Sequence, residues 1–249
     1  MVGTGIQIVG HLSHEARAWL SEADEVLHLI PGPVGEAIIE RIRPGRHETL
    51  LSLYVDGQQR RTTYDAMVQR ILSPVRAGRT VCAAFYGHPG VFSLVPHEAI
   101  ALARAEGHDA CMLPAISAED CLFADLGIDP AASGCTSYEA TDFVINERLV
   151  DPSAALILWQ IGKVGLFDTG PERSSPEALQ AVVDKLAPTH PATHPVVLYE
   201  AATLPREAAH VWPLELGELP TAATRAAHTL YVPPARPVAR DPRYDHLRP

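Results

Sequence analysis

The run from Thr80 to Phe85 constrains the fold of this chain most, because it is almost unbroken in apolar residues and ends at a sharp turn. A strand that is apolar on both faces is typical of a parallel sheet covered by helices on both sides. The turn is Gly87-His88-Pro89-Gly90, in which two glycines allow close backbone approach and a proline stiffens the chain. Open α/β sheets bind ligands at the carboxyl ends of their strands, so this turn is a candidate binding loop. A tight strand-to-helix connection without a ligand explains the same pattern equally well.

Strands and helices alternate along the rest of the chain, which predicts an α/β fold. Strands are expected at 2–8, 26–30, 80–85, 137–145, 155–161, 196–201 and 229–232. Helices are expected after Ser13, after Tyr64, over 96–106, from Ser117 and from Ser175. The apolar face of the first helix comprises Ala16, Trp19, Leu20 and Ala23. We expect an N-terminal α/β lobe at 1–112, a C-terminal α/β lobe at 113–234 with a cleft between the two, and a Pro- and Arg-rich tail at 235–249.

Composition and missing motifs exclude several classes of protein. The net charge is −10, whereas nucleic-acid binding needs clustered Lys and Arg, so no nucleic-acid partner is expected. No apolar run approaches the ~20 residues of a membrane span, and the N-terminus lacks a secretory signal pattern. The four cysteines lack CxxC spacing and are expected to be small buried residues of a reducing, cytoplasmic compartment. The HExxH, GxSxG, GxGxxG and P-loop motifs are absent, so we expect no metal and no phosphate-binding loop.

Arg60 and Tyr64 are four residues apart at an expected helix start, so they can share one helix face. A guanidinium and a phenol that point at one oxygen are suited to stabilising negative charge on it. Their spacing alone is also compatible with a solvated charged turn, because Arg61 follows Arg60 directly.

Several longer stretches resemble one known family. They are Tyr86-Gly87-His88-Pro89-Gly90-Val91-Phe92, the run from Leu113 through Ser117-Ala118-Glu119-Asp120 to Leu126, Gly134-Cys135, Tyr138-Glu139-Ala140, Trp159-Gln160-Ile161-Gly162, His194-Pro195-Val196-Val197 and Leu230-Tyr231-Val232-Pro233-Pro234. In this order they resemble the borosin peptide α-N-methyltransferases, which have the tetrapyrrole (corrin/porphyrin) methylase fold and methylate backbone amides of a ribosomally made peptide. The resemblance spans nearly the whole chain, and the run from Leu113 is its most specific part.

The resemblance implies S-adenosyl-L-methionine as the methyl donor. The residues expected to bind it are Tyr86, His88, Val91, Phe92, Ser117, Ala118, Gln160, Ala202, His228 and Thr229. The donor carries a sulfonium and no phosphate, so backbone groups and a largely apolar wall can hold it. Without the resemblance, His88 would be read as a turn histidine bonded to nearby backbone.

The resemblance also implies the catalytic residues. Arg60 and Tyr64 fall on the family's Arg and Tyr and are expected to stabilise the amide oxygen, while Tyr54 is expected to be the base. The family has a further tyrosine at the position of Leu51, so a supporting hydroxyl is missing here. Alternatively, the tyrosines pack at the protein surface and have no catalytic role.

The partners follow from the same resemblance. Fused members continue past Pro234 into a clasp region and a core peptide that they methylate on themselves, whereas the short tail 235–249 follows here. We therefore expect the split form, in which a separate precursor peptide is methylated in trans, and a homodimer whose second subunit completes the peptide groove. The alternatives are a C-methyltransferase of a corrin or porphyrin precursor and a homologue that binds a peptide without turnover.

Overall fold

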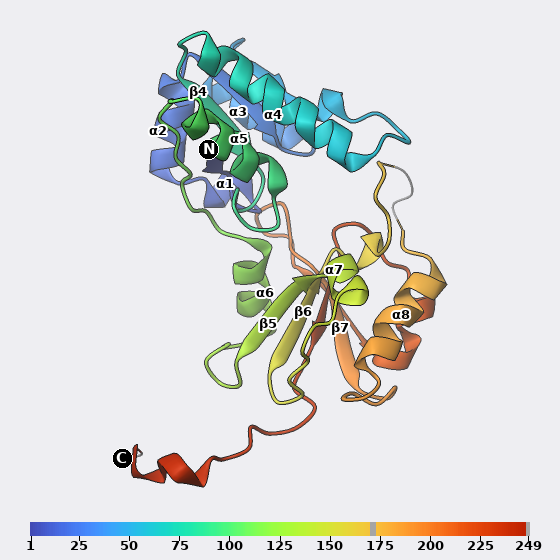
Figure 1. The fold of residues 1–249 in the computed structure, drawn as a ribbon. Coiled ribbons are helices and arrows are strands. Elements are labelled where there is room, and N and C mark those ends of the chain that lie inside the picture. Colours follow the sequence, from blue (N-terminus) through green and yellow to red (C-terminus); the bar gives the residue numbers. More distant parts are fainter. Residues whose placement is uncertain (170–172, 248–249) are drawn as a thin grey trace. The chain divides into compact units, whose positions relative to one another are not determined.

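The computed structural model describes residues 1–169 and 173–247, and their contacts form two compact units (Figure 1). Unit 1 comprises 1–126, 167–169 and 201–209, and unit 2 comprises 127–166, 173–200 and 210–247. The sequence-based boundary lay at 112, but the contacts extend unit 1 to Leu126. One reason is that the Leu113 backbone N–H donates to the Met1 carbonyl at 2.9 Å, which ties the segment after 112 to the first strand.

Unit 1 is built on a parallel sheet of four strands in the order β1-β4-β2-β3. The strands are β1 (Val2–Gly3), β2 (Glu25–Leu29), β3 (His47–Thr49) and β4 (Val81–Phe85). Gly3 and Leu29 both pair with Phe85 in register, so the three strands end together at one edge of the sheet. The loops that follow them therefore meet at this carboxyl edge.

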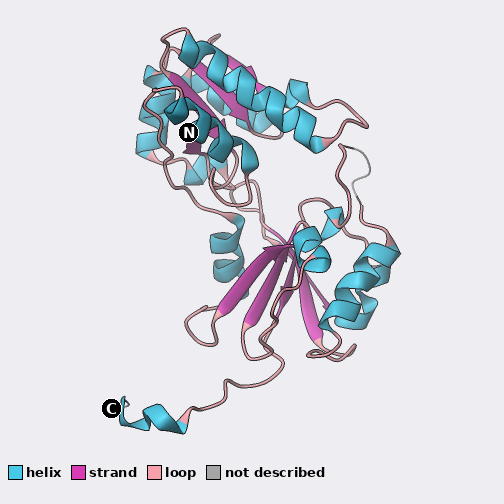
Figure 2. Ribbon diagram, viewed as in Figure 1, coloured by secondary structure: helices cyan, strands magenta, loops and turns pink. Residues whose placement is uncertain are grey.

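Helices cover both faces of this sheet, as the apolar run of β4 predicted (Figure 2). One face packs against α4 (Arg60–Arg76) and α5 (Leu94–Ala105), together with the 3-10 turn η1 (Leu50–Leu53). The other face packs against α2 (His14–Glu22) and α3 (Pro33–Ile42). The short helices α1 (Ile8–His11) and α6 (Ala118–Leu126) complete the unit. The start of α2 is confirmed, since Ser13 accepts a hydrogen bond from the Ala16 N–H, but Trp19 is 44% exposed and does not share the buried face.

Unit 2 holds a mixed sheet of five strands in the order β5-β6-β9-β7-β8. The strands are β5 (Cys135–Glu139), β6 (Ala155–Trp159), β7 (Pro195–Glu200), β8 (His210–Glu215) and β9 (Thr229–Val232). One face packs against α7 (Ala140–Ile145), α8 (Pro176–Leu186) and the 3-10 helix η3 (Leu216–Thr221). The sequence predicted α8 correctly, with Ser175 as its cap and Leu179, Val182, Val183 and Leu186 buried. A second 3-10 turn, η2 (Ile161–Lys163), follows β6.

Two expected strands are wrong in their second halves. The first ends at Gly3, because Gly5 has a φ of +68° and pairs with Gly87 before the chain turns into α1. The strand expected at 137–145 ends at Glu139, whose carboxylate accepts the Asp142 N–H at 2.8 Å and so starts α7. An acidic N-cap outweighed the β-branched residues of this stretch. The helix α3 and the edge strand β8 were not predicted.

The remaining expectations concern the cysteines, the C-terminal tail and membrane-spanning helices. Of the four free cysteines only Cys82 is buried, while Cys111 is exposed and Cys121 and Cys135 are half-buried, so the expectation of four buried thiols is wrong. The expected extended tail contains the 3-10 segment η4 (Pro242–Leu247), and its last two residues lie outside the described part. Within residues 1–169 and 173–247, no helix is both long and apolar enough to cross a bilayer.

Candidate active site

The predicted catalytic residues lie around one turn at the carboxyl edge of the unit 1 sheet. Tyr54 follows η1, and Arg60 and Tyr64 occupy the first two turns of α4, as their spacing predicted. Between them, the Gln58 N–H donates to the Val55 carbonyl at 3.1 Å, and Gly57 adopts a φ of +75°. This is a β-turn that needs glycine at its third position. The turn brings the segment that carries Tyr54 back to the helix that carries the other two residues.

The neighbours of Tyr54 shift the pKa of its hydroxyl. Burial raises the pKa of Tyr54 most, and the proximity of Tyr64 and Tyr86 raises it further. The Arg60 guanidinium lowers this pKa, but by less than burial and the two tyrosines raise it. Tyr54 is thus protonated at neutral pH in the free protein, and its expected role as the base stays a prediction. The fold brings Tyr54, Tyr64, Tyr86 and Arg60 near one another, while their catalytic and binding roles stay predictions.

The Gly87-His88-Pro89-Gly90 loop leaves β4 beside these tyrosines. The Gly87 N–H donates to the Gly5 carbonyl at 3.0 Å, which holds the loop against the end of β1. The Nδ1 atom of His88 accepts the Gly90 N–H at 2.9 Å, so His88 shapes the turn as the alternative interpretation proposed. Phe92 has a φ of +48°, a region that bulky side chains rarely adopt, and it is 47% exposed. A strained aromatic residue in the loop that follows a buried strand is a sign of a functional loop.

The close approach of this loop to β1 leads to a first prediction. A Cβ atom on Gly3 would lie 2.4 Å from the Gly87 carbonyl oxygen and 2.6 Å from Pro89 Cδ. Gly3→Ala is therefore expected to lower the free energy of unfolding by about 1–3 kcal/mol, as overpacking does in a rigid site. Urea denaturation measures this change. The control is Gly10→Ala, where no heavy atom lies within 4 Å of the added Cβ. Equal stability of the two variants would contradict the tight packing.

Ser117 starts α6 with a reciprocal cap. Its N–H and its hydroxyl both donate to the Asp120 carboxylate at 2.7 Å, and its oxygen accepts the Asp120 N–H at 3.3 Å. The predicted helix start is thus confirmed, with Ala118 as the first helical residue. Ser117 belongs to unit 1, as do Val91 and Ala202.

The other expected cosubstrate residues are grouped in unit 2. Gln160 directly follows β6 and lies in the left-handed region with a φ of +56°, and the Ile161 N–H donates to the His228 carbonyl at 3.1 Å. Thr229 follows as the first residue of β9 and is buried. The structure therefore places Gln160, His228 and Thr229 together, while their part in cosubstrate binding stays a prediction.

His228 also has neighbours that the sequence did not predict. The Glu200 Oε2 atom lies 3.3 Å from its Nε2 atom, and the Trp212 ring centroid lies 4.9 Å from its own. The Arg225 N–H donates to its Nδ1 atom at 3.3 Å, which leaves the proton of neutral His228 on Nε2, toward Glu200. Burial lowers the pKa of His228 despite Glu200, so the ring is neutral at neutral pH. No motif marks Glu200 or Trp212 in the sequence.

The buried histidines give a second prediction. Burial lowers the pKa of His28, His190 and His228, which are at most 3% exposed. In the unfolded chain their pKa returns to about 6.5, so the unfolded state binds protons that the folded state does not. Stability is thus fully present above this value and is lost as the pH falls through it. Urea denaturation between about pH 7.5 and about pH 5.5 should show a loss of at most about 1.4 kcal/mol per pH unit for each histidine.

The stability loss should come from these side chains rather than from general acid denaturation. His190→Gln removes one of them and is expected to flatten the slope. Stability that stays constant across this pH window would contradict the assignment of neutral buried rings.

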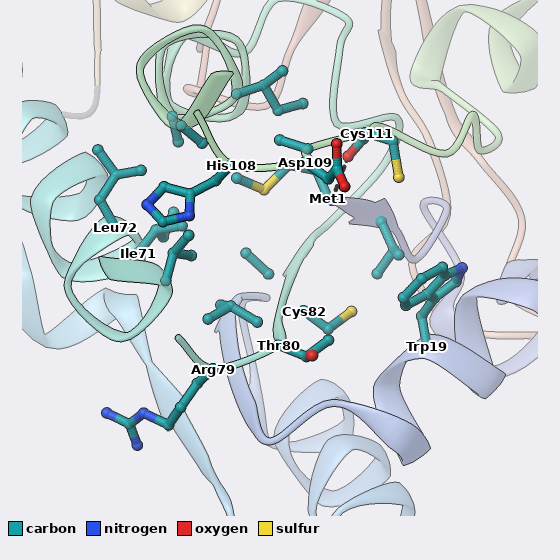
Figure 3. A pocket seen from close by; sticks show the side chains of 18 of the residues that line it. Met1, Trp19, Ile71, Leu72, Arg79, Thr80, Cys82, His108, Asp109 and Cys111 are labelled. Atoms are coloured by element: carbon teal, nitrogen blue, oxygen red, sulfur yellow. Dashed lines mark hydrogen bonds between the residues drawn. The ribbon is translucent and has the colours of Figure 1, made fainter. Parts of the chain in front are cut away.

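A pocket of about 670 Å³ lies elsewhere in unit 1, at the amino end of β4 (Figure 3). Its lining includes Met1, Trp19, Thr80, Cys82 and Cys111. None of the predicted catalytic or cosubstrate residues lines it. Parallel sheets bind substrates at the carboxyl ends of their strands, so a pocket at the amino end of β4 is not the place where the chemistry is expected.

Comparison with known proteins identifies the family. Residues 1–220 match the family described as "Tetrapyrrole (Corrin/Porphyrin) Methylases". The chain belongs to this family. Solved members of the fold agree: uroporphyrin-III-C-methyltransferase from Thermus thermophilus superimposes with a TM-score of 0.66 at 19% identity, covering 94% of this chain and 93% of that chain. Cobalt precorrin-4 methyltransferase does so with a TM-score of 0.64 at 17% identity, covering 94% of both. These likenesses confirm the predicted tetrapyrrole-methylase fold.

Curated relatives of this methylase are considerably more similar in sequence. A "methyltransferase/ribosomally synthesized type I borosin cyclic peptide precursor" from Serendipita vermifera subsp. bescii is 39% identical over 239 residues, which cover 94% of this chain. The precursor of the cyclic peptide omphalotin A from Omphalotus olearius, also named a methyltransferase, is 39% identical over 238 residues and 94% of this chain. The chain spans 58% and 57% of the length of these two relatives.

Proposed function

We propose that this tetrapyrrole methylase transfers methyl groups from S-adenosylmethionine to backbone amide nitrogens of a ribosomally made peptide. One observation carries the proposal: Arg60 and Tyr64 lie in the first two turns of one helix, and Tyr54 lies near enough to Tyr64 and Tyr86 for both to raise its pKa. The names of the relatives, which combine a methyltransferase with a cyclic peptide precursor, support the same substrate class.

The residues around this edge suit the methyl donor. S-adenosylmethionine supplies an electrophilic methyl group on a positively charged sulfonium. Tyr86 and Phe92 are 52% and 47% exposed and offer aromatic faces, which attract a sulfonium as they attract other cations. In unit 1, the donor would be held by these two residues together with His88, Val91, Ser117 and Ala118, in a loop whose glycines permit contact with the backbone.

The catalytic groups address the poor reactivity of an amide. Its nitrogen lone pair is delocalised into the carbonyl, so a nucleophilic nitrogen requires negative charge on the oxygen and loss of the N–H proton. We assign Arg60 and the Tyr64 hydroxyl as donors to this oxygen. Tyr54, in its ionised form, would take the proton from nitrogen as the N–C bond forms and the S–CH3 bond of the donor breaks, which leaves neutral S-adenosylhomocysteine. Since the pKa of Tyr54 is raised in the free protein, only a minor fraction carries this base at neutral pH.

We further propose that the precursor is a separate polypeptide and that the enzyme is a homodimer. The first proposal is tested by comparing a separately supplied peptide with the same peptide fused after Pro249. Modification of the fused peptide alone would contradict action in trans.

Light scattering of the purified chain tests the dimer, and a monomer at working concentration would contradict it.

The proposed activity is tested by incubating the protein with S-adenosylmethionine and synthetic precursor peptides, followed by intact mass spectrometry. The expected result is a peptide that gains the mass of one CH₂ for each methyl group. Parallel incubation with a uroporphyrinogen tests the ring-methylating alternative. Methylation of the ring without methylation of any peptide would contradict the proposal, and so would binding of the donor without any methyl transfer.

A further inference from the structure

The helix that carries Arg60 and Tyr64 starts without a side-chain cap. Its N-cap residue Gln59 makes no capping hydrogen bond through its side chain. Instead the Arg60 N–H donates to the Phe167 carbonyl at 2.9 Å, and Gln59 forms an isolated antiparallel bridge with Asp168. The first N–H groups of a helix have no partner within the helix. A segment more than a hundred residues away in sequence supplies one here.

The same segment also binds the turn that precedes the helix. The Thr169 N–H donates to the Gln58 carbonyl at 2.9 Å. The Thr169 hydroxyl lies within hydrogen-bond reach of the Val55 carbonyl and, at 3.1 Å, of the Gln58 carbonyl. The Gln58 side chain in turn donates to the hydroxyl of Thr63, which is fully buried in the first turn of the helix, at 3.2 Å. Residues 167–169 therefore hold both the turn 55–58 and the start of α4.

We infer that Thr169 is a positioning residue for methyl transfer, because its hydroxyl fixes the turn that sets Tyr54 and Arg60 relative to each other. Tyr54 precedes this turn and Arg60 follows it, so a shift of the turn changes the distance between the base and the oxygen-binding cation. The inference rests on the proposed function. Thr169 itself contacts backbone carbonyls of the turn and acts through Tyr54 and Arg60.

The test uses variants that separate the hydroxyl from the shape of the side chain. Thr169→Val keeps the volume and removes the hydroxyl, whereas Thr169→Ser keeps the hydroxyl. In peptide methylation, Thr169→Val is expected to lower kcat about tenfold or more with KM nearly unchanged, because misplaced catalytic groups slow the chemical step. Thr169→Ser is expected to keep most of the activity. The control is Thr221→Val in unit 2, where the lost hydroxyl donates to the Glu218 carbonyl at 3.0 Å.

A second readout does not depend on activity. Hydrogen–deuterium exchange of the free protein should become faster at residues 55–63 in Thr169→Val, but not in Thr169→Ser or Thr221→Val. Full kcat in Thr169→Val, unchanged exchange at 55–63, or an equal defect in the serine variant would overturn the inference. If Thr169→Val does not fold, Thr169→Ala replaces it in both measurements. A wild-type protein that methylates no peptide refutes the proposed function, and the exchange experiment still decides whether Thr169 holds the turn.

Discussion

Replacing Arg60 with alanine is expected to lower kcat for peptide methylation by about 100- to 1,000-fold, the effect of losing one donor to a developing negative charge in an active site. Arg60 starts α4 next to the tyrosine cluster, and it is the cation that acts on Tyr54. Arg60→Lys is expected to recover only part of the rate, because an ammonium lacks the planar fork of the guanidinium. Single-turnover rates with saturating donor and peptide measure both effects.

The neighbouring arginine provides a matched control. Arg61 is also at the start of α4, but its side chain is 58% exposed and pairs with Asp65 at 2.8 Å and Glu98 at 2.7 Å. Exposed ion pairs contribute little to stability, so Arg61→Ala should methylate the peptide at close to the wild-type rate. If both variants lost the same factor in methylation rate, the positive charge at the start of α4 would matter rather than the specific position of Arg60.

Replacing Tyr54 with phenylalanine is expected to lower kcat by about 100- to 10,000-fold, the usual range for removal of a general base. Burial, Tyr64 and Tyr86 raise the pKa of Tyr54, so the ionised form is scarce at neutral pH. Below this pKa the population of the base rises about tenfold per pH unit. The wild-type rate of the chemical step should therefore increase with pH between about pH 7 and about pH 10, and the phenylalanine variant should lose this dependence.

The pH profile separates a base from a hydrogen-bond donor. A rate that is independent of pH over this window would contradict the role of Tyr54 as base, even if Tyr54→Phe is slow. Tyr244→Phe is the control for tyrosine replacement, because Tyr244 is 55% exposed in the tail. It should leave both the rate and its pH dependence unchanged.

The sequence predicted those elements whose local signals agree with their packing. The run at 80–85 became β4, and the serine before Pro176 became the cap of α8. The prediction failed where a single residue decides the direction of the chain. Glu139 caps a helix inside an expected strand, and Gly5 bends the first strand away from the sheet after Gly3. Such effects depend on one hydrogen bond or one dihedral angle, which hydrophobic periodicity does not reveal.

In the candidate site, too, the sequence predicted some features and missed others. The spacing of Arg60 and Tyr64 placed both on α4, and the resemblance placed Tyr54 beside them. Neither indicated Thr169, since its partners are backbone carbonyls of a distant turn, which any sequence supplies. The raised pKa of Tyr54 was also not predicted, because it arises from burial of the hydroxyl among tyrosines that the fold brings together.

The most direct test of the central claim is to locate the transferred methyl group by fragment-ion mass spectrometry of a peptide methylated with a deuterated donor. Each label is expected on a backbone nitrogen, and Arg60→Ala is expected to remove these labels while Arg61→Ala does not. Labels on side chains or on a peptide terminus, with unlabelled backbone nitrogens, would contradict the assignment of Arg60, Tyr64 and Tyr54 as the groups that activate an amide.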